Sequence, residues 1–337
     1  MPSTDPLKIQ IALWGGTSTG KTTFLSALRI AMLYDSVGAW KMVGRDDLQP
    51  GSVEFVARKT EDFLHGNFPE ANVGKGERAI CTISSTLIQD RFSKLIGTIF
   101  NRPSCVSFDL YIQDYPGGTF IEAGYEDEFW DYLVKCDGFI YLYDPLRDAT
   151  DQTNYDYLQK AIDFVTLALQ KHHRQAQFAT LLPHYVAVCI TKFDHPDTFK
   201  RLDDAGLVVW DSTGAPLVPD AAAAFRLLAD KLVVNTIERS FLPSRIRYFV
   251  TSSVGFYQDA GGCIDRGDLY NVVPGANRLR SEAHPINVFE PLIWIASQLW
   301  YPAIVLAIHR SLPALQKQIR KIKVHLAALL ADLRNPN

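Results

Sequence analysis

Residues 15 to 22 read Gly-Gly-Thr-Ser-Thr-Gly-Lys-Thr and lie between two regular segments. An apolar run at residues 8 to 14 predicts a buried strand, and residues 21 to 34 have the period of a helix. The positions that match the pattern GxxxxGK[ST] are Gly15, Gly20, Lys21 and Thr22. In this pattern the backbone N–H groups of small residues surround phosphates, and the helix N-terminus adds positive potential. Because both the strand and the helix are present, the stretch predicts a phosphate-binding loop.

Two side chains of this loop have expected roles of their own. Lys21 would reach the β- and γ-phosphates of a nucleotide, and Thr22 would be a ligand of Mg²⁺. The residues expected to contact the nucleotide at this end are Gly15, Gly16, Thr17, Ser18, Thr19, Gly20, Lys21, Thr22 and Thr23.

Apolar runs alternate with segments of helical period along the rest of the chain. Further strands are predicted at residues 79–88, 105–113, 138–143, 184–191 and 245–251, and further helices at 52–65, 122–136, 153–173, 220–237 and 287–300. Strands that are apolar on both faces and separated by helices indicate a parallel sheet covered on both sides. We therefore expect an α/β fold, a doubly wound and mostly parallel sheet, in one domain of residues 1–302.

Three segments are additions to a minimal nucleotide-binding α/β fold. One lies near residues 38–78 and carries the helix at 52–65, and a second, 206–219, resembles a small hairpin that turns at Asp-Ser-Thr-Gly. The third, 258–286, is rich in glycine and proline. Long loops in a compact domain are often functional, so these insertions are candidates for contact with a partner.

A second motif, Asp-Tyr-Pro-Gly-Gly at residues 114–118, directly follows a predicted strand. Asp114 at that strand end could hold Mg²⁺ through water, and Gly117 could offer its N–H to a γ-phosphate. Taken alone the motif is an ordinary turn, because Asp, Pro and Gly all favour turns. Its position after the first loop gives it weight.

A third motif selects the base. Thr191, Lys192 and Asp194 match [NT]KxD at the end of another apolar strand, where the carboxylate would pair with the N1–H and 2-amino groups of guanine. Adenine lacks both donors, and an unpaired buried carboxylate would cost about 1–3 kcal/mol or more. The motif therefore predicts guanine.

A fourth motif, Thr-Ser-Ser-Val-Gly at residues 251–255, follows the last predicted strand. Ser252 and Ser253 could present backbone N–H groups to the guanine O6 atom. In isolation a helix N-cap explains the same residues equally well.

The four motifs stand in this order, each at a strand end, and over roughly residues 8–300 the chain resembles P-loop GTPases of the Ras-like, translation-factor-related class. The resemblance implies GTP or GDP and Mg²⁺ as ligands and hydrolysis of GTP to GDP and phosphate. It implies Lys21, Thr22, Asp114 and Gly117 as catalytic residues, with Thr22 and Asp114 as metal ligands. The Asp-x-Pro-Gly motif and the 287–294 segment are also similar to bacterial double-GTPase proteins of predicted conflict systems, which implies a protein partner.

The pattern departs from that class at two places. Gly118 stands where many Ras-like proteins have a glutamine that orients water, so we expect unaided hydrolysis to be slow. The threonine that should cap Mg²⁺ before the second strand is replaced by Asn72, with Thr82 as an alternative, and the sequence leaves both open. A hydrolysis-poor pseudo-GTPase that acts as a scaffold is therefore a second hypothesis. A third is an ATP-using P-loop enzyme, which makes the third motif a coincidence.

The C-terminal region, residues 303–337, is expected to form a helix with a heptad seam. Leucine or isoleucine recurs at alternating spacings of three and four, at Leu312, Leu315, Ile319, Ile322, Leu326, Leu329 and Leu333. This stripe must be buried either against the domain or against a partner, which makes residues 312–333 and the switch regions the expected partner contacts. Residues 291–308 carry no charge over a length that could span a membrane, but Pro302 favours a broken core helix.

Composition gives weaker constraints. The 34 basic and 37 acidic residues are spread along the 337-residue chain, which is no footprint of nucleic-acid binding. The five cysteines form no CxxC pair and are expected to be buried, reduced thiols of a cytoplasmic protein. The leading hypothesis is therefore a cytoplasmic, Mg²⁺-dependent GTPase that acts as a molecular switch and binds guanine nucleotide.

Overall fold

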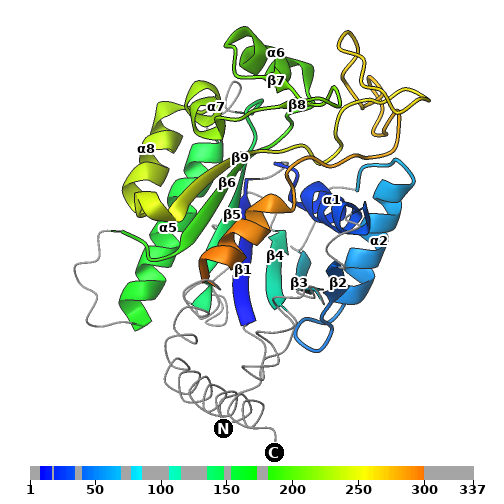
Figure 1. Cartoon of the computed structure of the whole chain (residues 1–337). Helices are drawn as coiled ribbons and strands as arrows, with labels where there is room; N and C mark the ends of the chain where they lie inside the picture. Colours follow the sequence, from blue (N-terminus) through cyan, green and yellow to red (C-terminus); the bar gives the residue numbers. More distant parts are fainter. Residues whose placement is uncertain are drawn as a thin grey trace, which may run out of the picture.

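The computed structural model describes residues 8–16, 19–34, 40–69, 77–85, 106–114, 135–147, 153–172 and 181–299 (Figure 1). The helix expected at 122–136, apart from its last two residues, and the heptad seam at 312–333 lie outside these ranges.

A seven-stranded sheet forms the centre of the fold, with the strand order β2-β3-β4-β1-β5-β6-β9. Its strands are β1 (Lys8–Gly15), β2 (Trp40–Gly44), β3 (Glu77–Ser85), β4 (Val106–Asp114), β5 (Gly138–Tyr143), β6 (Tyr185–Ile190) and β9 (Ile246–Val250). The strands from β4 to β9 in this order are parallel, whereas β3 is antiparallel to both β4 and β2. The sheet is therefore mostly parallel, as the apolar runs predict.

Helices cover both faces of this sheet (Figure 1). They are α1 (Lys21–Tyr34), α2 (Ser52–Leu64), α5 (Thr153–His172), α6 (Pro196–Asp204), α7 (Ala221–Leu228) and α8 (Lys231–Ser240), and residues 290–299 form a further helix. Helices α1, α2 and 290–299 pack on one face, and α5 to α8 pack on the other. The architecture is α/β.

Alternation along the inner strands divides the core between the two faces. In β1, Ile9, Ile11 and Leu13 belong to the core under α1, whereas Ala12 and Trp14 belong to the core under α5. Every residue of β5 is buried. Strands buried on both faces read as continuous apolar runs, which is why the sequence shows them clearly.

Three elements differ from the sequence-based expectation. Strand β2 was missed, and it forms the sheet edge through pairing with β3. The helix expected at 220–237 is two helices, because Ala229 is extended and the Asp230 side chain accepts a hydrogen bond from Leu232 N and starts α8. The helix expected from residue 287 begins only at Glu290, after Asn287 with its positive φ of 50°.

The hairpin predicted in 206–219 is present as β7 (Val209–Trp210) and β8 (Pro216–Leu217), which are antiparallel. Asp211 closes the turn by accepting hydrogen bonds from the backbone N–H groups of Thr213 and Ala215. This hairpin, α6 and the 258–286 segment all lie at the end of the sheet where the parallel strands terminate (Figure 1). Strand β1 has β4 on one side and β5 on the other, so the strand order reverses there, and ligands of open α/β sheets bind at such a point.

The helix at 290–299 covers the described part of the uncharged run at 291–308. Leu292 and Ile295 are fully buried, and a Cβ atom on Gly138 of β5 would lie 2.9 Å from Ile295 Cγ2. This half of the run is thus core, as Pro302 suggested for the whole. Among the described helices, none combines the length and apolar character needed to span a bilayer.

Three of the four described cysteines, Cys81, Cys136 and Cys189, are buried free thiols as expected. Cys263 contradicts the expectation of burial, because it is exposed in the glycine-rich 258–286 segment.

Candidate functional site

The loop from β1 to α1 has the tight geometry that its glycines allow. A Cβ atom on Gly15 would lie 2.5 Å from Thr19 Oγ1 and 3.1 Å from the Leu142 carbonyl oxygen of β5. Gly20 has a φ of 89°, a conformation that favours glycine. The Phe24 N–H donates to the Gly20 carbonyl at 2.7 Å and so begins α1. Gly15 and Gly20 are therefore needed by the loop itself.

Lys21 places its ammonium group on the inside of this loop. The side chain is buried, and Nζ donates hydrogen bonds of 2.9 Å to the carbonyl oxygens of both Gly15 and Gly16. The hydroxyl of Thr19 also donates to Gly16 O, at 2.9 Å. The first turn of α1 contains no acidic residue, so the positive potential of its N-terminus is not neutralised from within the helix. The loop thus concentrates positive charge at one strand end, which suits an anion such as a phosphate group.

The second motif is described only for its strand. Leu13 of β1 pairs with Ile112 of β4, so Asp114 reaches the level of Gly15 on the neighbouring strand. Asp114 therefore ends β4 beside the loop, where a metal ligand is expected. Thr17, Ser18, Gly117 and Gly118 and the side chain of Asp114 lie outside the described residues.

Of the two candidates for the threonine before the second strand, Thr82 lies in the middle of β3. It pairs with Asp109 of β4, which in turn pairs with Gln10 of β1, five residues before Gly15. That separation corresponds to roughly 16 Å along the strand. Arg45 Nη1 donates to the Thr82 hydroxyl at 2.9 Å. Thr82 is therefore too far along the sheet to serve the loop, and Asn72 lies outside the described residues.

The third motif forms a cluster at the ends of β5, β6 and β9. We call Asp144, Lys192, Asp194 and Ser252 the base cluster. Lys192 has a positive φ of 58°, and its Nζ forms an ion pair of 2.6 Å with Oδ2 of the buried Asp144. Such a backbone conformation is unfavourable for a residue other than glycine and is often found at functional sites. Thr191 donates from its hydroxyl to the Tyr143 carbonyl at 3.0 Å, so it ties β6 to β5.

Asp194 is the second buried acid of the base cluster. Its side chain is 5% exposed, and Ser252 Oγ donates to Oδ1 at 2.5 Å. Burial raises the pKa of Asp194 to about 6, although the Ser252 hydrogen bond, a backbone hydrogen bond and the charge of Lys192 each lower it. This carboxylate is ionised at neutral pH but poorly solvated. Additional hydrogen-bond donors would stabilise it, since each of its oxygens can accept more than one hydrogen bond.

The fourth motif holds the Asp194 side chain through Ser252. The Ser252 hydroxyl accepts from Gly255 N at 2.7 Å while it donates to Asp194. The Ser252 N–H donates to the Ile286 carbonyl at 3.0 Å. Ser252 thus positions the carboxylate. Of the two serines expected to offer a backbone N–H to the guanine O6 atom, Ser252 therefore uses its own N–H within the fold.

Sequence reasoning missed three residues here. Asp144 directly follows the apolar strand at 138–143, and an acid at a strand end was a signal that could have found it. His195 and Tyr270 carried no such signal. Their rings are 5.2 Å apart in a T-shaped pair beside Asp194, and burial lowers the pKa of His195 although Asp197 and Asp144 oppose this. Burial, and then the charge of Asp194, raise the pKa of Tyr270.

The described residues contain no group of three or more His, Cys, Asp or Glu side chains that could hold a metal ion. The oxygen ligands expected for Mg²⁺ are Thr22, in the first turn of α1, and Asp114, at the end of β4 next to β1. A protein-bound Mg²⁺ ion typically retains several waters and is completed by substrate phosphates. A hydroxyl and a carboxylate are oxygen ligands of the kind that Mg²⁺ prefers.

No family model matches the chain, and no curated protein matches it. Any functional assignment thus depends on the chemistry of these residues.

Proposed function

We propose that this chain is a P-loop GTPase, which binds guanine nucleotide with Mg²⁺ and hydrolyses GTP to GDP and phosphate. The observation that carries the proposal is the position of the buried Asp194. It is held by Ser252 at the carboxyl ends of the parallel strands, where the loop that contains Lys21 also lies. The Asp194 carboxylate would accept hydrogen bonds from a base, and the Lys21 ammonium group would donate hydrogen bonds to phosphates. A ligand with both parts is a nucleotide.

Guanine fits this arrangement better than adenine. Its N1–H and 2-amino groups supply two donors to Asp194, whereas adenine would leave a buried carboxylate without them. Lys192, held to Asp144, would lie along the base, and Ser253 would face the guanine O6 atom. Rejection of a ligand that leaves such a group unpaired is worth about 10² or more in affinity.

In the hydrolytic reaction Lys21, Thr22, Asp114 and Gly117 would act on the phosphates. Lys21 donates to oxygens of the β- and γ-phosphates, and Thr22 and Asp114 would hold Mg²⁺, which when bound neutralises charge that develops on these oxygens. Gly117 would offer its N–H to the γ-phosphate. Because Gly118 follows, no glutamine orients the attacking water at that position, and we expect hydrolysis to be slow without a partner.

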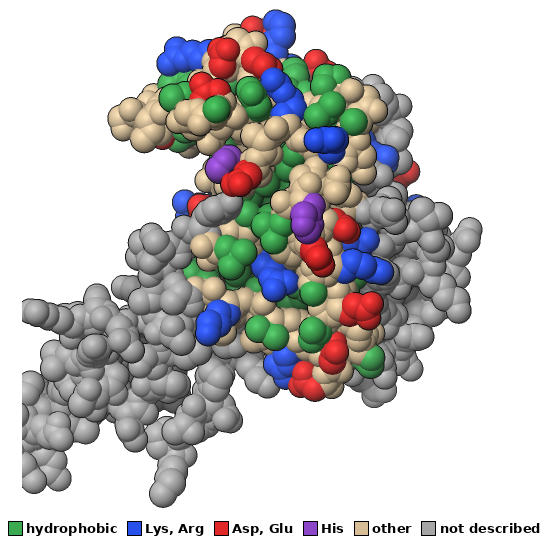
Figure 2. Space-filling view, turned by 90° about the vertical axis from the view of Figure 1, so that its right-hand side faces the viewer, with side chains coloured by type: hydrophobic (Ala, Val, Ile, Leu, Met, Phe, Trp, Pro, Cys, Tyr) green, Lys and Arg blue, Asp and Glu red, His purple; other side chains and the backbone are tan. Residues whose placement is uncertain are grey.

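A protein partner is part of this proposal. Helices α1 and α2 carry exposed apolar side chains at Leu33, Val53 and Leu64, which are 68%, 47% and 55% exposed. On the face that includes these helices, hydrophobic side chains are interspersed with both acidic and basic ones (Figure 2). Residues 312–333 are the second proposed contact, and a cytoplasmic switch in a bacterial conflict system is the context that the sequence resemblance suggests.

The test is equilibrium binding of fluorescent GDP, ADP and XDP, with Mg²⁺, to the wild type and to Asp194→Asn. Wild type should prefer GDP over ADP by about 10² or more, and Asp194→Asn should prefer XDP, whose C2 oxygen can accept from an amide. Asp163→Asn, an exposed aspartate on α5, is the matched control and should behave as wild type.

Equal binding of ADP and GDP by the wild type would instead support an ATP-using enzyme. Release of phosphate from bound GTP then separates the switch from a scaffold, because a pseudo-GTPase would retain GTP without releasing phosphate.

A further inference from the structure

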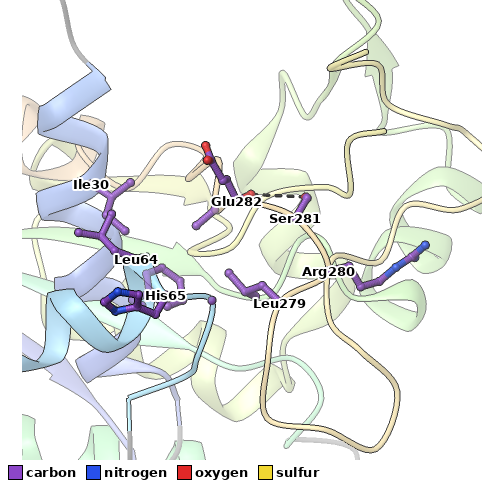
Figure 3. Close-up of a pocket in the computed structure, with 10 residues that line it drawn as sticks. Ile30, Leu64, His65, Leu279, Arg280, Ser281 and Glu282 are labelled. Atoms are coloured by element: carbon purple, nitrogen blue, oxygen red, sulfur yellow. Dashed lines mark hydrogen bonds between the residues drawn. The ribbon is translucent and has the colours of Figure 1, made fainter. Parts of the chain in front are cut away.

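The 258–286 segment is fixed against α1 and α2 on one side. The Leu279 N–H donates to the Gly66 carbonyl at 2.7 Å, and the Leu279 side chain is 5% exposed. Figure 3 shows Leu279 turned toward Leu64 and His65, across an open pocket of about 310 Å³, while Arg280 points away from them. Alternate residues of the segment therefore face different parts of the molecule.

The segment is also fixed to the fourth motif. Gly255, with a φ of 71°, approaches the segment so closely that a Cβ atom would lie 2.1 Å from the His284 carbonyl oxygen. The fully buried Asn271 donates from Nδ2 to the carbonyls of Val254 at 3.2 Å and Glu282 at 3.3 Å, and its Oδ1 accepts from Ser281 N at 2.9 Å. The position of the segment is thus set relative to Ser252 and Asp194.

Tyr270, next to Asn271, is held from both sides. Its backbone forms a bridge with Phe256, and its carbonyl accepts from Arg280 Nη1 at 3.0 Å. The same guanidinium group forms two hydrogen bonds of 2.6 Å with the Asp268 carboxylate and lies over the Tyr257 ring. Tyr270 therefore has a fixed direction.

That direction brings the Tyr270 ring to the base cluster. It meets the His195 ring edge to face, with centroids 5.2 Å apart and planes at 74°. The charge of Asp194 acts on the Tyr270 hydroxyl. The His195 side chain is 27% exposed and Tyr270 is also partly exposed, so both rings keep accessible surface beside a carboxylate that is itself buried.

We propose that Tyr270 and His195 form an aromatic wall of the guanine pocket and that Tyr270 contacts the bound base. This inference depends on the proposed function, because it assigns a further residue to the same site. An aromatic ring binds the π-face of any base, whereas Asp194 reads its edge. The 258–286 segment thereby controls how long a guanine nucleotide is retained, and Asp194 controls which base is accepted.

The test compares release of fluorescent GDP, chased by unlabelled GDP with Mg²⁺, from wild type, Tyr270→Ala and Tyr270→Phe. Tyr270→Ala should release GDP about 10-fold faster, with the ratio of GDP to XDP affinity unchanged, and Tyr270→Phe should resemble wild type. Tyr185→Ala is the matched control, because this partly buried tyrosine lies at the opposite end of β6.

Tyr270→Trp gives an independent readout if Tyr270→Ala does not fold. The added tryptophan should keep GDP bound, and its emission, taken as the difference from wild type, should fall when GDP binds. Unchanged release from folded Tyr270→Ala, or unchanged emission from GDP-bound Tyr270→Trp, would overturn the inference while the proposed function stands. A wild type that binds no guanine nucleotide would overturn the proposed function itself, and this inference with it.

Discussion

The glycine-rich loop between β1 and α1 and the base cluster both lie at the carboxyl ends of the parallel strands, but they are assembled from different amounts of chain. The loop is one stretch between β1 and α1, and its Lys21 binds carbonyl groups five and six residues away. In the base cluster, Lys192 meets a residue 48 positions away and Ser252 meets one 58 positions away. The loop depends on local sequence, whereas the cluster depends on the alignment of β5, β6 and β9.

This difference separates two kinds of failure. A substitution in the loop should weaken the binding of all nucleotides equally, because every nucleotide carries phosphates. A change in the base cluster should alter which base is preferred or at which pH it binds, because that cluster contains a titrating group at its centre.

The largest effect is expected from Lys21→Met, which keeps the length of the side chain and removes its charge. It should raise the Kd for GDP and GTP by about 10² or more, since hydrogen bonds to a charged group contribute about 1.5–3 kcal/mol each. Titration with fluorescent nucleotides measures this, and the preference for guanine should survive in the residual binding. Lys231→Ala, an exposed lysine of α8, is the control. An unchanged Kd would show that the loop binds no phosphate.

A smaller, pH-dependent effect is expected at Asp194. Its pKa of about 6 means that the carboxylate is ionised at neutral pH, so GDP affinity should fall as the pH drops through about 6. Ser252→Ala removes a hydrogen bond that lowers this pKa, so the fall should begin at a higher pH and GDP should bind about 5- to 10-fold more weakly near neutral pH. Titrations of GDP across this range measure the shift, with ADP as the insensitive control. A GDP affinity that does not change with pH would exclude Asp194 as the base acceptor.

The raised pKa of Asp194 also makes the stability of the nucleotide-free chain depend on pH. This dependence runs opposite to that of GDP affinity, because stability rises as the pH falls. The folded form binds the Asp194 proton more tightly than the unfolded form, whose pKa is about 3.9. Burial of this carboxylate therefore lowers the free energy of unfolding above about pH 6, and the penalty disappears as the pH falls toward about 4.

The smallest effect is expected from Arg280→Gln. Its partner Asp268 is 48% exposed and Arg280 itself 27%, and exposed ion pairs contribute about 0–1 kcal/mol. GDP release should accelerate about 2- to 3-fold, less than for Tyr270→Ala, because the bridge to Phe256 remains. Release kinetics measure this, with Arg226→Gln on α7, whose arginine forms a similar ion pair with Glu238, as the control. A larger effect than that of Tyr270→Ala would mean that the segment acts through its overall position.

The inner strands could be predicted from the sequence because both of their faces are buried. Strand β2 could not, since it lies at the edge with Lys41 and Val43 exposed and has only five residues. The break between α7 and α8 was hidden because the apolar pattern continues past Asp230. Only the hydrogen bond that the Asp230 side chain accepts from Leu232 N shows that a new helix starts there.

The candidate site shows the same division. Sequence order alone could place three of its parts together, because each stands at the carboxyl end of a strand. These parts are the glycine-rich loop after β1, Asp114 and the Thr191 to Asp194 motif. The functions assigned to them remain predictions. Tyr270 lies 75 positions from His195 in an irregular segment, and nothing in its local pattern predicts that the two rings meet. Such contacts arise from Asn271 and Gly255, whose roles are visible only in three dimensions.

The hydrogen bonds of Lys21 to Gly15 and Gly16 have a consequence for how fast a ligand can be captured. The ammonium group is already ordered and desolvated before any anion arrives, so the loss of its rotational freedom belongs to folding of the chain. An incoming phosphate would meet a preorganised donor, and association need not wait for that side chain to search for its conformation. The rate of encounter would then limit association of the phosphate group with this end of the site. The slow steps would be those of nucleotide dissociation.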